Sequence, residues 1–414
     1  MTVLTTDRPS SVFKGYLARR ALAPLVAALR LLCIPGCGGG SDAPSGGDAP
    51  SGGDASSTAV RDTRGPDGSA GPEEAASPGA ADSVADAPTI PEIADAADAS
   101  SDTGAVDAAT GIQGPETFHG VNWADARDNF VNGLLQLSGL DTTADTYATV
   151  QAKTTQIVSQ FRTKLGANTI RIPINEPTVA GAWWSAYKAV IDTATAQGVK
   201  VMIAYWAYHN GKPDDEAAFK AMWQTVVSAY ATNDLVYFDI HNEPYGYGSS
   251  WNDEAAKWLG YFPSLPKGRV IVAGTGYDDN VTTVGGDTRF AGYPLEFHIY
   301  GFQHTTWTTQ KQWTDAFNAA IGSSASRTIV GEWGDTMNTG TDYDTDASDG
   351  NNALSYVITM ASYIRGKGMG SCYWPGLRNG DGYSMTKLAT SGTTLTLSVV
   401  NASGLDRLRW AWNL

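Results

Sequence analysis

From Phe118 onward, the chain alternates between two hydrophobic patterns. Short runs of β-branched and aromatic residues alternate with stretches whose apolar residues recur every three or four positions. The first pattern is typical of buried strands and the second of amphipathic helices. The predicted strands are Phe118–Trp123, Thr169–Ile174, Lys200–Tyr205, Leu235–Ile240, Arg269–Ala273, Leu295–Tyr300, Thr328–Val330 and Gly370–Trp374. Their starts lie roughly 30 residues apart, which is the length of one strand, loop and helix.

Helical patterns fill the gaps between these strands. The predicted helices are Tyr147–Leu165, Trp184–Gln197, Glu216–Tyr230 and Asn352–Lys367, and glycines follow three of them as stop signals. Eight strands with intervening helices predict an α/β fold, a (β/α)8 TIM barrel. A doubly wound sheet is disfavoured because the first strand leads into Asn122 and Trp123 rather than a glycine-rich loop. Near the C-terminus, Thr394–Val400 predicts a small β insertion before a closing helix at Ser403–Trp412.

Aromatic residues and charge divide the chain into three segments. Only Phe13 and Tyr16 of the 42 aromatic residues precede Phe118. Residues 38–112 contain two basic and fourteen acidic residues among Ala, Gly, Ser and Pro, with the repeat DAPSGG. Such a segment cannot bury enough apolar area to offset the entropy of ordering it. We therefore expect a disordered acidic linker over 38–112 and the catalytic barrel over 113–414.

Residues 1–37 have the order of an export signal. The apolar run 21–32 follows Arg19 and Arg20, and small residues then precede Cys37. This resembles a bacterial lipoprotein signal, in which Cys37 would be acylated and become the mature N-terminus. We expect export to the cell surface or the outer membrane as a lipoprotein, or release outside the cell. The alternative is an ordinary cleaved signal with an incidental cysteine.

Composition narrows the function classes for the barrel. The chain has 28 basic against 43 acidic residues and no basic stripe, which argues against a nucleic-acid partner. It contains no run of 18 apolar residues that could span a membrane. Cys372 is the one cysteine of the barrel segment, and we interpret it as a small buried hydrophobe. We expect a monomer.

Polar and aromatic residues gather at the carboxyl ends of the predicted strands, where barrels of this kind build their sites. Two carboxylates stand out, because Glu243 ends the fourth strand and Glu332 the seventh. Hydrolysis of a glycosidic bond needs a proton donor and a second carboxylate. Other polar and aromatic residues near strand ends are Asn122, Arg171, Trp206, His209, Asn242, His298, Tyr300 and Trp374.

These residues form an ordered set that resembles glycoside hydrolase family 5 over about residues 118–414. The set comprises Arg171 in IRIP, Asn242-Glu243-Pro244, His298-x-Tyr300, Gly331-Glu332-Trp333-Gly334 and Trp374. The resemblance implies a retaining enzyme that works by double displacement, with Glu243 as general acid/base and Glu332 as nucleophile. It implies a polysaccharide or oligosaccharide as the partner. It implies no cofactor and no metal, because the two carboxylates suffice.

The same resemblance implies roles for the surrounding residues. Asn242 would contact the sugar 2-hydroxyl, and Arg171 would support the nucleophile. His298 and Tyr300 would line the reacting subsite, with Tyr300 hydrogen-bonded to the nucleophile, and Trp374 would form its aromatic platform.

One position departs from the family pattern. Many members have a histidine at the end of the third strand, where this chain has Trp206, and His209 follows three residues later. Both are kept as candidate substrate-binding residues. The departure puts plain cellulose specificity in doubt, so a β-1,4-glucanase-like endo-hydrolase is the default and a mannan- or furanoside-active hydrolase is the alternative. A carbohydrate-binding protein without catalysis, or an adhesion scaffold, is the alternative from another class.

The acidic loop 342–350 spaces carboxylates as calcium loops do. Ala347 and Ala353 stand where an EF-hand needs Gly and Glu, so a solvated turn is the better interpretation.

Overall fold

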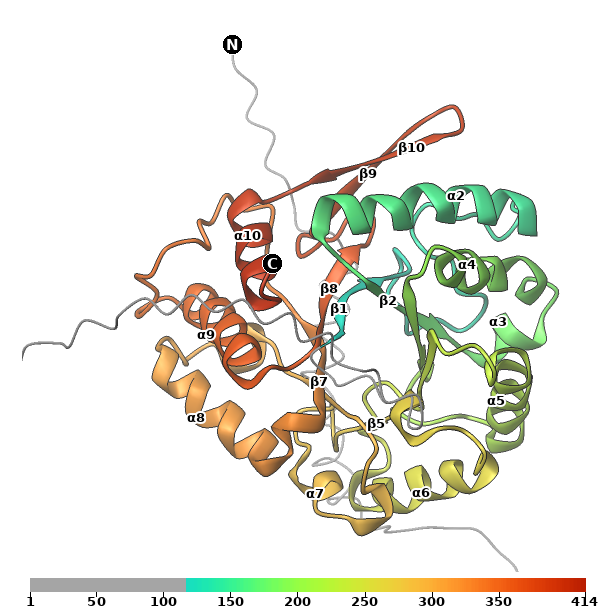
Figure 1. Cartoon of the computed structure of the whole chain (residues 1–414), viewed down its shortest axis with the longest axis horizontal. Helices are drawn as coiled ribbons and strands as arrows, with labels where there is room; N and C mark the ends of the chain where they lie inside the picture. Colours follow the sequence, from blue (N-terminus) through green and yellow to red (C-terminus); the bar gives the residue numbers. More distant parts are fainter. Residues whose placement is uncertain (1–116) are drawn as a thin grey trace, which may run out of the picture. The chain divides into compact units, whose positions relative to one another are not determined.

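A computed structural model of the chain describes residues 117–414. The predicted signal 1–37 with Cys37, and the predicted linker 38–112, lie outside the described residues. Figure 1 shows strands enclosed by helices, with the β9–β10 hairpin projecting beside α2. No helix within 117–414 has the length and apolarity needed to cross a membrane.

Eight parallel strands close into a barrel. Each strand pairs with the next along the chain, and β1 also pairs with β8, which completes the ring. The strands are β1 (His119–Trp123), β2 (Thr169–Ile174), β3 (Lys200–Tyr205), β4 (Val236–Asp239), β5 (Val270–Ala273), β6 (Leu295–His298), β7 (Thr328–Trp333) and β8 (Ser371–Leu377). The predicted (β/α)8 barrel is therefore confirmed, and the predicted strand positions agree to within three residues at each end.

Helices follow the strands and cover the barrel (Figure 1). They are α2 (Tyr147–Gln160), α3 (Glu176–Ala180), α4 (Trp184–Ala196), α5 (Glu216–Tyr230), α6 (Trp251–Tyr261), α7 (Thr282–Gly285), α8 (Gln310–Ile321), α9 (Asn352–Lys367) and α10 (Ala402–Ala411). Local chemistry explains their ends. The Asp215 carboxylate caps α5 by accepting two backbone N–H groups, and Gly368 ends α9 in the left-handed conformation that glycine tolerates best.

The barrel interior is filled in layers. Six buried residues from strands or strand starts form one cluster, consisting of Phe118, Met202, Tyr237, Ile271, Ile329 and Cys372. Cys372 is a free and fully buried thiol, as predicted, and burial raises its pKa. On β2, Arg171 lies two residues beyond Thr169 and is therefore closer to the carboxyl end of the strand. The arginine makes the interior polar at that level.

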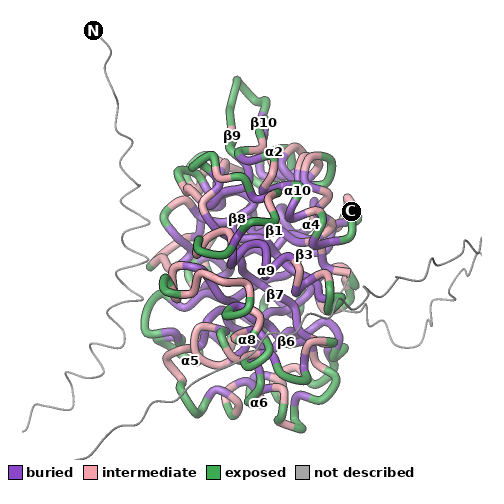
Figure 2. Tube along the Cα trace, turned by 90° about the vertical axis from the view of Figure 1, so that its left-hand side faces the viewer, coloured by how far each residue is buried: buried purple, intermediate pink, exposed green. Residues whose placement is uncertain are grey.

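The β insertion is a two-stranded hairpin. Strand β9 (Thr386–Ser391) pairs antiparallel with β10 (Thr394–Val399), and Leu377 of β8 pairs with Thr386. The sequence pattern identified the second strand and missed the first, because β9 is largely exposed and has no apolar run. The tip of the hairpin is exposed (Figure 2). Side-chain amides of Gln156 and Gln160 on α2 bond the backbone of β10 and anchor it.

Candidate active site

Arg171 is the centre of a buried polar network inside the barrel. Its guanidinium donates to Asp239 Oδ2 at 2.7 Å, to Glu332 Oε1 at 2.8 Å and to Asn242 Oδ1 at 2.8 Å. Its Nε also lies 2.9 Å from Glu296 Oε1. Burial opposes the positive charge, but the carboxylates of Glu296, Asp239 and Glu332 raise the pKa of Arg171 well above its usual value. A planar guanidinium suits this arrangement because its five N–H donors diverge in fixed directions.

Glu332 lies on β7 and is held at both carboxylate oxygens. Arg171 donates to Oε1, and the Tyr300 hydroxyl donates to Oε2 at 2.7 Å. A bulge in the strand directs this side chain inward, because Phe297 pairs with Val330 whereas His298 pairs with Glu332, which leaves Gly331 unpaired. A charged donor and a hydroxyl donor both stabilise the ionised carboxylate. Glu332 is thus held in one orientation by donors on both oxygens.

Glu243 follows β4 in a left-handed backbone conformation, with φ of 50°. Its backbone N–H donates to Asp278 Oδ2 at 2.9 Å. The preceding residue, Asn242, donates its backbone N–H to the Tyr205 carbonyl at 2.8 Å and accepts from Arg171 through Oδ1. The Nδ2 of Asn242 has no hydrogen-bond partner in the described part of the chain. That amide group remains available to a ligand beside Glu243.

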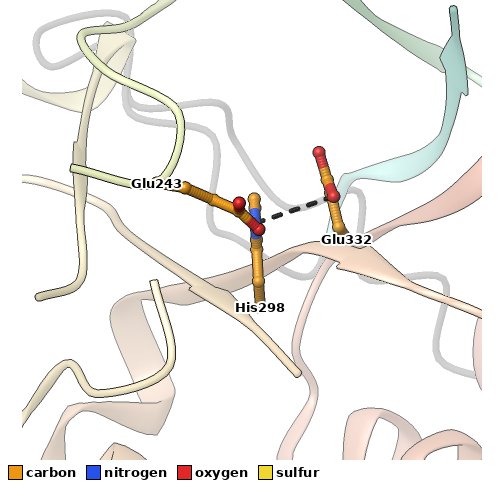
Figure 3. A group of neighbouring side chains, drawn as sticks. All are labelled: Glu243, His298 and Glu332. Atoms are coloured by element: carbon orange, nitrogen blue, oxygen red, sulfur yellow. Dashed lines mark ion pairs between the residues drawn. The ribbon is translucent and has the colours of Figure 1, made fainter. Parts of the chain in front are cut away.

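His298 lies between the two glutamates, which enter the site from opposite sides (Figure 3). Its Nδ1 is 3.5 Å from Glu243 Oε1 and 3.8 Å from Glu332 Oε2. The ligand atoms of these three side chains all lie within 4.8 Å of one another. The predicted pair of carboxylates, 89 residues apart in the sequence, is therefore brought to one place by the barrel.

Aromatic side chains line the same end of the barrel. Trp374 on β8 stacks on Trp206, with ring centroids 5.5 Å apart and an interplanar angle of 21°. Phe130, in the loop after β1, contacts the Trp206 ring edge-to-face at 4.5 Å. Tyr300 belongs to the same buried cluster. The structure thus groups Trp206 and Trp374 with Tyr300, which holds Glu332.

His209 lies apart from this group. It belongs to the turn after β3, where its half-exposed ring contacts Tyr208 and its Nδ1 lies 3.3 Å from Asp214. Because the Asp214 side chain is itself 60% exposed, this pair faces solvent. Of the two candidates near the end of the third strand, the structure brings Trp206 to the site and leaves His209 outside the network.

Three buried carboxyl groups of the network escaped the sequence analysis. Burial raises the pKa of Asp239, Glu296 and Asp278, and the neighbouring carboxylates raise those of Asp239 and Asp278 further. The Glu296 carboxylate is among the groups that raise the pKa of Asp239, because two neighbouring like charges disfavour ionisation of both. Acidic residues inside the apolar runs VYFD and LEFH were the available signal, because a charge within a buried strand needs a partner.

Two groups of side chains have the composition of a metal site. They are Glu243, His298 and Glu332, and Asp278, Glu296 and His298. In the second group Asp278 faces Nδ1 of His298 while Glu296 faces Nε2, at 3.5 and 3.3 Å. One ion cannot use both nitrogens, so this geometry suits a hydrogen-bonded chain through the imidazole. An ion in the first group would neutralise both strand-end glutamates.

Comparisons with known proteins agree with this architecture. The fold is similar to that of the catalytic domain of the major endoglucanase from Xanthomonas campestris pv. campestris, with 17% identity, a TM-score of 0.53, and coverage of 72% of this chain and 95% of that one. It is also similar to an endocellulase from Pyrococcus horikoshii in complex with cellotetraose, with 14% identity, a TM-score of 0.52, and coverage of 71% and 92%. At these identities the likeness establishes the fold alone. No curated protein matches the sequence.

The sequence itself carries the family relationship. Residues 124–379 match the model of Cellulase (glycosyl hydrolase family 5). This range includes Arg171, Glu243, Glu332 and Trp374, so it spans the residues that the barrel gathers around His298. The chain belongs to glycoside hydrolase family 5.

Proposed function

We propose that the protein is a retaining β-glycosidase in which Glu332 is the nucleophile and Glu243 the general acid/base. The observation that supports this most directly is the separation of the two carboxylates, whose oxygens approach within 4.8 Å. Retaining enzymes hold the two carboxyl groups about 5–5.5 Å apart, whereas inverting enzymes need about 6.5–9.5 Å to admit a water molecule between them.

Both steps of the double displacement then have the carboxyl groups that they need. The ionised Glu332 attacks the anomeric carbon while Glu243 gives its proton to the departing glycosidic oxygen. In the second step the Glu243 carboxylate takes a proton from water, and that water's oxygen displaces Glu332 from the sugar. Arg171 and Tyr300 hold the Glu332 carboxylate in place before attack. Pre-organised donors of this kind need no reorganisation during the reaction.

The remaining residues bind the sugar in the reacting subsite. Trp374 provides an apolar face for the ring, backed on one side by Trp206. The Asn242 amide, held by Arg171, would donate to the 2-hydroxyl group through its Nδ2. His298 lies between the two carboxylates and fixes their spacing. Hydrogen bonds to that hydroxyl strengthen in the oxocarbenium-like transition state.

The default substrate is a β-1,4-glucan cleaved internally. The similar structures are named as an endoglucanase and an endocellulase, which supports this choice for the present chain. Trp206 favours the alternative of another β-linked substrate, because its indole N–H can only donate a hydrogen bond, whereas the histidine found in many family members can both donate to and accept from a sugar hydroxyl. Mannans and furanosides are therefore tested beside glucans.

Sugar release from a panel of soluble β-glucans, mannans, xylans, galactans and furanosides tests the proposal. The full chain is compared with Glu332→Gln and Glu243→Gln, and with Glu216→Gln, an exposed glutamate on α5, as the matched control. Release by the wild type and the control, lost in both site variants, would support hydrolysis by this pair. A folded wild type that binds glucan without releasing sugar would support the binding-protein alternative.

We also infer that the protein is exported and anchored by a lipid on Cys37. The support is the order of basic residues, apolar run and cysteine within 1–37. Membrane fractionation of the full chain and of Cys37→Ser, expressed in a bacterial host, tests this. Transfer of the variant to the soluble fraction is expected, and an unchanged distribution would contradict the lipid anchor.

A further inference from the structure

The loop after β5 directs one acidic side chain into the barrel. The loop is closed by a bridge between Thr275 and Asn280, with the Thr275 N–H donating to the Asn280 carbonyl at 2.8 Å. Within it, Asp278 has φ of 59°, a conformation that aspartate tolerates better than most residues. Asp278 is fully buried, whereas the next residue, Asp279, is exposed. Within this turn the Asp278 side chain is therefore buried in the barrel, whereas that of Asp279 faces solvent.

Asp278 joins the ends of two other strands. Its Oδ2 accepts the backbone N–H of Glu243 at 2.9 Å. Its backbone carbonyl accepts the backbone N–H of His298, also at 2.9 Å. The same Oδ2 lies 3.5 Å from His298 Nδ1. One residue of the β5 loop therefore contacts both the acidic residue after β4 and the imidazole on β6.

Glu243 needs such support. Its φ of 50° lies in the left-handed region, which is unfavourable for a residue other than glycine and persists only where the surroundings hold it. The hydrogen bond to Asp278 satisfies the buried N–H of this strained residue. Removing the Asp278 acceptor would allow the Glu243 peptide to rotate, and the Glu243 carboxyl group would move with it.

We propose that Asp278 is a positioning residue for general acid catalysis, which holds Glu243 in the conformation that directs its carboxyl group at the glycosidic oxygen. This inference rests on the proposed function. It concerns geometry, and a displacement of about 1 Å in a catalytic group can lower the rate about 100-fold.

The protonation state of Asp278 decides which substitution mimics it. The charged groups of the surrounding network are Glu243, Glu296, Asp239, Glu332, Arg171 and, when protonated, His298. Burial and the neighbouring carboxylates raise the pKa of Asp278 well above its usual value. A neutral acid still accepts a hydrogen bond through its carbonyl oxygen. Asparagine is therefore the nearest neutral mimic, and alanine removes the acceptor.

Two aryl substrates separate positioning of the acid from general damage. Phenyl β-cellobioside has a poor leaving group that needs protonation, whereas 2,4-dinitrophenyl β-cellobioside has a leaving group that departs as a stable anion. For the full-length Asp278→Ala variant, kcat/KM should fall about 100-fold with the phenyl substrate and at most about threefold with the dinitrophenyl substrate. Asp278→Asn should stay within about fivefold of wild type on both, because its amide oxygen replaces the lost acceptor.

Controls make every outcome decisive. Asp279→Asn removes a carboxylate from the same loop and should change neither value. Equal losses of kcat/KM on both substrates, or no loss in Asp278→Ala, would overturn the proposal. Should the alanine variant fail to fold, Asp278→Ser offers a side chain too short to reach the Glu243 amide and serves in the same comparison.

Failure of the proposed function is a distinct result. A wild type that cleaves neither cellobioside would refute glucoside hydrolysis and leave the role of Asp278 to a crystal structure of the alanine variant. There the Glu243 peptide should leave the left-handed region. An unchanged Glu243 would overturn the positioning role whatever the substrate.

Discussion

Tyr300 donates its hydroxyl group to Oε2 of Glu332 at 2.7 Å, and both side chains are buried. The two residues come from neighbouring regions of the barrel, since Tyr300 follows β6 and Glu332 lies on β7. Because Arg171 occupies the other oxygen, Glu332 has one charged and one neutral donor. The contact with Tyr300 is therefore expected to orient Glu332 for its proposed role as nucleophile.

Removal of this hydroxyl tests the orientation of Glu332. A hydrogen bond to a charged group contributes about 1.5–3 kcal/mol, so Tyr300→Phe should lower kcat/KM by about 10–100-fold. Tyr187→Phe removes another buried tyrosine hydroxyl, which bonds the Pro173 carbonyl, and is the matched control. Steady-state kinetics measures the activity of both variants, and thermal melts measure their stability. Equal activity of Tyr300→Phe and wild type would contradict the orienting role.

The raised pKa of Asp239 predicts a pH-dependent stability. The pKa of Asp239 is raised by burial, so the folded protein retains a proton that the unfolded chain releases as pH rises above about 4. The stability that this proton contributes is therefore lost as pH rises from the pKa of Asp239 in the unfolded chain toward its pKa in the folded protein.

Asp239→Asn places an amide where the protonated acid stands, so it should remove this loss. The variant should gain free energy of unfolding relative to wild type as pH rises from 4 to 8, by on the order of 1.4 kcal/mol for each pH unit in which only the folded state holds the proton. Urea unfolding at several pH values measures the difference. Parallel stability curves would show that Asp239 is ionised in the folded state.

The position of Gly331 at the bulge of β7 has no space for a larger residue. A Cβ atom built there would lie 1.7 Å from Glu296 Oε1, which the Arg171 ion pair holds in place. Gly331→Ala should destabilise the fold by about 1–3 kcal/mol, as overpacking does. Gly260→Ala in α6 meets no atom within 4 Å and should stabilise by about 0.5–1 kcal/mol through helix propensity. Thermal melts that rank the two variants in the opposite order would contradict this.

Replacement of Trp206 is expected to change the substrate preference. Trp206→His removes the stack on Trp374 and the Phe130 contact while adding a hydrogen-bonding ring. A site that can bond a sugar hydroxyl discriminates between substrates more sharply than an apolar one. The ratio of kcat/KM for glucan over mannan should rise about tenfold or more. Trp410→His, at an exposed tryptophan of α10, is the control, and an unchanged ratio would exclude Trp206 from specificity.

Hydrophobic periodicity predicted most of the fold. Strands β2 and β3 and helices α5 and α9 have the bounds read from the sequence. Asn175 directly follows β2 and Gly368 directly follows α9, which are the stop signals expected there. The pattern missed β9, whose exposed residues carry no such run. No range was predicted for helices α6 and α8. The short helices α3 and α7 were also missed, since four or five residues are too few for a helical period.

The sequence by itself determined the barrel and the residues at its strand ends, including Glu243 and Glu332. Local periodicity and strand order suffice for that, because parallel strands of a barrel present their carboxyl ends on one face. The tertiary structure alone decided that Asp239, Glu296 and Asp278 surround Arg171 and His298, and that Trp206 rather than His209 lies beside Trp374. The bulge at Gly331 depends on the pairing of β7 with β6, and Asp278 contacts Glu243 and His298 from two other strand ends. Sequence patterns along one strand do not specify such contacts between strands.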